Sequence, residues 1–131
     1  MKKILIASLT GGALLFSTAA FADLAGELNT AQTHASLAAK GANINAVNMH
    51  LHHALNCLVG PAGTGFDKTN ANPCANAGKG ILVDSTDAAQ KTKLQAAVAD
   101  ANKGIAATDL AAAQAAANDT ASTLEDSAVT I

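Results

Sequence analysis

Histidine is scarce in this sequence and unevenly placed. Of four histidines in 131 residues, His50, His52 and His53 closely follow Met49, and the fourth is His34. At about 100° per residue, a helix puts His50 and His53 on one flank, near Met49, and turns His52 toward the other flank. Imidazole nitrogens bind copper, zinc, nickel and iron, while a thioether favours copper. The spacing therefore predicts a transition-metal site, with copper preferred and zinc or nickel as alternatives.

The expected ligands differ in how directly the spacing supports them. His50 and His53 are three residues apart and are the first choice, because side chains at this spacing can converge on one ion. Met49 and His52 are the next candidates, and His34 is a candidate ligand from the preceding helix. Histidines on a helix flank also occur as plain solvated residues, and this alternative stays open. A metal site of this kind suits carriage, sequestration or sensing, and two molecules that share one ion would form a metal-linked homodimer.

Other cofactors and catalytic arrangements are less well supported. Haem is disfavoured, since the chain lacks a Cys-x-x-Cys-His motif and the histidines flank the apolar stripe instead of facing inward. Gly60 and Gly65 have the spacing of a phosphate-binding loop, but Phe66 and Asp67 stand where that loop needs Lys and then Ser or Thr. No serine lies in a motif for acyl transfer. We therefore expect a protein that is not an enzyme.

The segment 1–22 has the pattern of a secretory signal peptide. Two lysines at positions 2 and 3 precede an apolar run over residues 4–16, and an Ala-Phe-Ala tripeptide at 20–22 supplies the small residues before a cut. The apolar run is shorter than the roughly 20 residues that span a bilayer. These features predict a mature domain of residues 23–131, periplasmic or secreted, with no membrane span.

Export determines how the two cysteines are interpreted. Cys57 and Cys74 enclose 16 residues, and thiols in an oxidising compartment tend to pair. We therefore predict a disulfide that closes this loop and stabilises the fold by roughly 3 kcal/mol on the chain-entropy account. The alternative is a Cys57 thiolate that serves as a metal ligand.

Apolar residues recur at steps of three and four in four segments of the mature chain, which predicts four helices. The predicted helices cover residues 23–40, residues 44–58 after an Asn43 N-cap, a segment from Asp84-Ser85-Thr86-Asp87 to Lys103-Gly104, and a segment that starts at a Thr108 N-cap. The mature chain contains 28 alanines, whereas strands favour β-branched and aromatic residues. The predicted fold class is therefore all-α, a small antiparallel four-helix bundle.

The connection between the second and third predicted helices is long. Residues 59–83 contain five Gly and two Pro, and loops of this length are commonly functional or disordered. With the disulfide pinning it, the loop either covers one end of the bundle or docks a periplasmic protein, with Phe66 as the anchor. This interaction module is the alternative to metal binding. Six lysines against ten acidic residues give the mature chain a net charge of −4, which argues against nucleic-acid binding.

Overall fold

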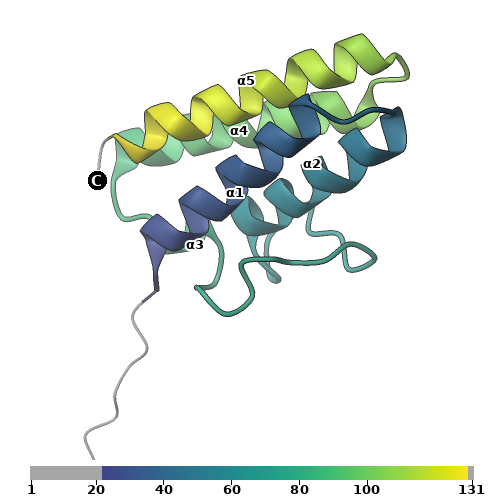
Figure 1. Ribbon diagram of the computed structural model, residues 1–131. Helices are drawn as coiled ribbons and strands as arrows, with labels where there is room; N and C mark the ends of the chain where they lie inside the picture. Colours follow the sequence, from purple (N-terminus) through teal and green to yellow (C-terminus); the bar gives the residue numbers. More distant parts are fainter. Residues whose placement is uncertain (1–21, 130–131) are drawn as a thin grey trace, which may run out of the picture.

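The computed structural model describes residues 22–129, which form five helices and no strand (Figure 1). The helices are α1 (Leu24–Ala39), α2 (Ile44–Val59), α3 (Ile81–Asp84), α4 (Ala88–Ala106) and α5 (Leu110–Ala128). Within this range the chain is all-helical, as predicted. The predicted signal peptide, residues 1–22, lies outside the described residues except for Ala22. None of the helices in the described range is long and apolar enough to cross a membrane.

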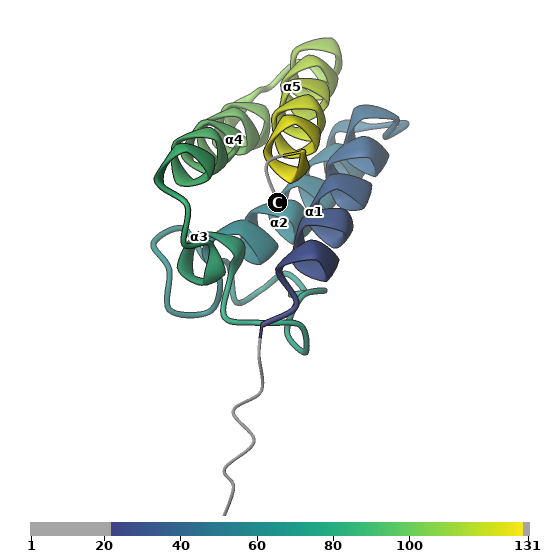
Figure 2. The same ribbon diagram turned by 90° about the vertical axis from the view of Figure 1, so that its left-hand side faces the viewer.

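The four long helices lie in two neighbouring pairs. α1 lies beside α2, and α4 lies beside α5 (Figures 1 and 2). α1 also packs on α5, and α2 packs on α4, so that the two pairs share one core. α3 is a single turn at one end of the molecule, where it contacts α1, α2 and α4 (Figure 2).

Side-chain caps start each of the long helices. Asp23, Asn43, Asp87 and Asp109 each accept a hydrogen bond from the backbone N–H three residues later, which satisfies a donor that has no partner within the helix. The predicted Asn43 cap is confirmed. The cap predicted at Thr108 is wrong by one residue, because Thr and Asp both cap well and the pattern alone does not separate neighbouring candidates.

The chain between α2 and α4 differs from the prediction. The sequence predicts one helix that begins near Asp84, but Ile81–Asp84 forms the separate turn α3 and α4 begins after Asp87. Ile81 is fully buried. The turn therefore forms around an apolar contact with the core, which a periodicity of three and four residues does not reveal in so short a segment.

Gly104 does not end α4 as predicted. The helix continues to Ala106, and Gly104 is a buried contact position inside it. A Cβ on Gly104 would lie 2.5 Å from Cδ1 of Leu51 and 3.2 Å from Cβ of Ala116. The glycine thus lets α4 approach α2 and α5 closely. This packing outweighs the tendency of glycine to end a helix.

Alanine makes up much of the interior. Buried alanines on all four long helices allow close approach, and a smaller number of larger side chains fill the space between the helices. The largest fully buried apolar side chains are Leu28, Leu51, Leu55, Leu58, Ile81, Leu94 and Leu124. Phe66 packs against this core and is partly buried. The Phe66 ring therefore covers part of the core.

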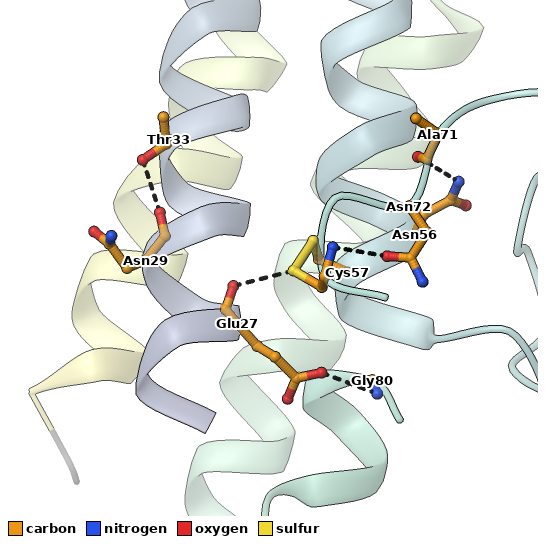
Figure 3. The surroundings of a disulfide bond; sticks show 9 residues. Glu27, Asn29, Thr33, Asn56, Cys57, Ala71, Asn72 and Gly80 are labelled. Carbon is orange, nitrogen blue, oxygen red and sulfur yellow. Dashed lines mark hydrogen bonds between the residues drawn. A yellow bond between two sulfur atoms is a disulfide. The ribbon is translucent and has the colours of Figure 1, made fainter. Parts of the chain in front are cut away.

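A disulfide holds the loop between α2 and α3, as predicted (Figure 3). Cys57 and Cys74 are bonded, with their Cα atoms 5.2 Å apart, and both residues are buried. The alternative in which Cys57 is a thiolate metal ligand is wrong, because its sulfur is committed to this bond.

Asn56 holds the same loop through hydrogen bonds. Its side chain is fully buried, and its Nδ2 donates to the carbonyl oxygens of Asp67 at 2.9 Å, Ala71 at 3.1 Å and Asn70 at 3.3 Å. Its Oδ1 accepts from the N–H of Asp67 at 2.9 Å. One amide side chain therefore satisfies four backbone groups in a loop that has no regular structure of its own.

The two ends of the loop meet at glycines. Gly60 has φ 71° and Gly80 has φ 120°, in the left-handed region where a side chain is strained. A Cβ on Gly60 would overlap the carbonyl oxygen of Lys79. Glycine is therefore required at this crossing both for its backbone conformation and for its lack of a side chain.

Candidate metal centre

Three of the four histidines come together where α1 packs against α2. His34 lies on α1, and His50 and His53 lie on α2. Each offers one ligand nitrogen, and these three atoms lie within 4.8 Å of one another. The ring centroids are 4.9 Å apart for His34 and His53, 5.5 Å for His34 and His50, and 5.8 Å for His50 and His53. These residues are called the three-histidine group below.

Alanine packing explains why rings from two helices can meet. Ala31 and Ala35 belong to the fully buried face of α1, and small side chains at a helix contact let the two backbones approach closely. His34 precedes Ala35 and lies at the edge of that face. On α2 the three-residue spacing of His50 and His53 places both rings on the side that faces α1.

The spacing of the nitrogens suits a metal ion. Nδ1 of His34 and Nδ1 of His50 are 3.3 Å apart, so that one ring can also donate an N–H to the other. A tetrahedral ion with metal–nitrogen distances of about 2.0–2.1 Å holds its ligand nitrogens about 3.3–3.4 Å apart. The Nδ1 atoms of His34 and His50 already have this separation. Closing the group around an ion requires the widest pair, at up to 4.8 Å, to move together by roughly 1.5 Å.

Two of the three rings have lowered pKa values. Burial lowers the pKa of His34 below its ordinary 6.5, and the neighbouring His53 and His50 lower it further. Burial also lowers the pKa of His53, with added effects from His50 and His52. Nδ1 of His53 is buried and has no hydrogen-bond partner. His34 and His53 therefore favour the neutral imidazole, the protonation state that a metal ion requires.

His52 does not join the three-histidine group. Its Nδ1 lies 3.3 Å from Oδ2 of Asp67 in the loop, an ion-pair distance at which the atoms are not aligned as a hydrogen bond. Hydrogen bonds from the side chains of Thr69 and Asn70 and from the N–H of Thr69 lower the pKa of Asp67 to about 2. His52 thus connects α2 to the loop through its contact with the ionised carboxylate of Asp67.

Met49 lies on the surface of α2, one turn before His53. Its side chain is 43% exposed, in agreement with its expected place on the outer face. The thioether is therefore accessible to an incoming ion or to another protein, while the three-histidine group is made without it.

Sequence reasoning missed the buried carboxyl group of Glu27, near the start of α1. Glu27 is fully buried, and burial is the main cause that raises its pKa from 4.5 to about 7. The N–H of Gly80 opposes this effect, while Asp84 and Asp23 add to it. The sequence contains an indication of this burial, because Glu27 lies four residues before Ala31 on the same buried face of the helix. A glutamate is nevertheless expected to be exposed by its type alone.

Comparisons with models of protein families, with curated proteins and with solved structures find no match for this chain.

Proposed function

We propose that this is an exported protein that binds one transition-metal ion, with copper preferred, at His34, His50 and His53. The observation that carries the proposal is the approach of three imidazole nitrogens to within 4.8 Å of one another, from two helices. A set of three imidazole nitrogen ligands suits copper, zinc and nickel. With no catalytic motif in the sequence, carriage, sequestration or sensing of the ion is the proposed role.

Copper is preferred for two reasons. The exposed thioether of Met49 lies one helical turn from His53, and thioethers favour copper over zinc, particularly as Cu(I). The sequence pattern of residues 1–22 and the Cys57–Cys74 disulfide both suit an exported protein, and bacteria handle surplus copper outside the cytoplasm. Haem stays the least favoured cofactor, because a macrocycle needs a cavity lined with large apolar groups and the interior is rich in alanine.

The fold suits this role as a rigid holder for the ligands. We propose that the four long helices form an antiparallel bundle, since only a few residues separate α1 from α2 and α4 from α5. The contact between α1 and α2 then sets the distance between His34 and the two histidines of α2. An ion bound there joins the two helices and stabilises the bundle in proportion to its concentration.

Titration of the purified protein with Cu(I), Cu(II), Zn(II) and Ni(II) tests this function. We expect one bound ion per chain, and a loss of roughly tenfold or more in affinity for His34→Ala, His50→Ala or His53→Ala. His52→Ala is the matched control, since it removes a histidine of the same helix that contacts Asp67 instead. Unchanged binding after replacement of both His50 and His53 would show that the site is elsewhere.

The coordination position that three histidines leave open is available to Met49, to water or to a second protein. Size-exclusion chromatography with and without metal distinguishes a metal-linked homodimer from a monomer that carries the ion. The interaction module based on the loop is less favoured, because Phe66, the proposed anchor, is packed against the core.

A further inference from the structure

Two carboxyl groups, of Glu27 on α1 and Asp84 on α3, come together near the start of α1. A Cβ on Gly78 would overlap Oδ2 of Asp84 and would lie 2.7 Å from Oε1 of Glu27, so both acids approach this one glycine. A side-chain hydrogen bond joins the two groups. Because a carboxylate has no hydrogen to donate, this bond exists only while one of the two acids is protonated. The two acids therefore share a proton.

Glu27 is the member of the pair that carries the proton. It is fully buried, and no other residue of the described chain donates a hydrogen bond to its Oε2. An ionised oxygen in this position is costly, because burial removes its hydration. Asp84 is only partly buried, and its Oδ2 accepts a hydrogen bond from the N–H of Lys79 at 2.7 Å, which favours its ionised form. The proton therefore lies on Glu27, which donates it in a hydrogen bond to the carboxylate of Asp84.

The pair attaches the end of the loop, residues 75–84, to α1. Oε1 of Glu27 accepts a hydrogen bond from the N–H of Gly80 at 3.1 Å (Figure 3). The disulfide ends at Cys74, so residues 75–84 lie outside the loop that it closes. α3 is a single turn at one end of the molecule (Figure 2), and Ile81 is its one buried residue. A segment with so little buried apolar surface can open while the long helices stay folded.

We propose that the proton shared by Glu27 and Asp84 acts as a pH-sensitive switch, which keeps residues 75–84 closed on α1 and releases them when it is lost. Without the proton, two neighbouring carboxylates repel each other. Asp84 on α3 and Asp23 before α1 are the charged side chains that act on Glu27, and both oppose its ionisation. Within the described residues, α2, α4 and α5 add no charged group to these acids. Lys79 contacts Asp84 through its backbone N–H, and its side chain is exposed.

Limited digestion with trypsin between about pH 6 and about pH 8 tests the proposal. Lys79 lies in the segment that opens, and Lys93 lies within α4. Dividing each cleavage rate by that of a short peptide with the same sequence removes the pH dependence of trypsin itself. The pKa of Glu27 is about 7 when closed, against 4.5 ordinarily, so corrected cleavage after Lys79 should rise roughly tenfold over this range. Cleavage after Lys93, which requires unfolding of α4, should be slower at every pH.

Three variants assign the effect to the pair. Glu27→Gln keeps the shape of the side chain, and its amide donates a hydrogen that is not lost in this pH range, so cleavage after Lys79 should stay constant. Asp84→Asn removes the second negative charge and should reduce the rise with pH. Glu125→Gln changes an exposed glutamate and should behave as the wild type does.

Several results would overturn the proposal. A corrected rate of cleavage after Lys79 that is independent of pH in the wild type would show that the pair is not a switch. The same rise in Glu27→Gln or an undiminished rise in Asp84→Asn would show that another group is responsible. Equal corrected rates at Lys79 and Lys93 would show that the whole fold opens instead of residues 75–84.

Discussion

Raising the pH in the presence of EDTA is expected to weaken the fold through Glu27. The pKa of this carboxyl is about 7 in the folded protein, against 4.5 ordinarily, chiefly because the group is buried. Between these pH values the folded protein holds a proton that the unfolded chain has released, so the free energy of unfolding falls as the pH rises. The contribution is intact below pH 4.5 and lost above pH 7. The difference of 2.5 between the pKa values corresponds to about 3 kcal/mol.

Urea unfolding of wild type and Glu27→Gln, followed by circular dichroism at a series of pH values, measures this contribution. Glutamine resembles the protonated acid at every pH, so the variant should match the wild type near pH 4.5 and exceed its stability by about 3 kcal/mol near pH 8. His34 and His53, whose pKa values are lowered, destabilise both proteins as the pH falls. The difference between the two curves removes this shared effect.

Two comparisons check the assignment to Glu27. Glu125→Gln, at an exposed position, should follow the wild type at every pH. Wild type and Glu27→Gln curves that run parallel from pH 4.5 to 8 would refute the reasoning. Glu27 would then be ionised throughout this range, with the N–H of Gly80 outweighing the effect of burial on its pKa.

Three further predictions concern the loop and the three-histidine group. Asn56→Ala leaves four backbone groups of the loop without their partner and should lower the free energy of unfolding by about 2 kcal/mol or more in urea titrations. Gly60→Ala should destabilise more than Gly65→Ala in thermal unfolding, because both glycines have positive φ but only Gly60 meets backbone atoms at the Cβ position. Metal affinity measured between pH 5 and 8 should decline only below about pH 6.5, since the pKa values of His34 and His53 lie under that value.

The features that depend on residues close together in the chain could be predicted from the sequence. The long helices were predicted from apolar spacing, and the Asn43 cap from its side chain, because both depend on residues within a few positions. The Cys57–Cys74 bond was predicted because the leader pattern indicates export, and two cysteines in an oxidising compartment have only each other as partners. The pairing of His50 with His53 on one flank of α2 follows from helical geometry in the same way.

The remaining features depend on contacts between distant parts of the chain. His34 joins His50 across 16 residues and Glu27 meets Gly80 across 53 residues, and no local pattern determines which helices become neighbours. His52 turns to Asp67 for the same reason, since its partner lies in an irregular loop. The sequence by itself determined the four long helices, the disulfide and the types of ligand present. Only the tertiary structure decided which side chains meet and which are buried, because both are set by the packing of whole helices.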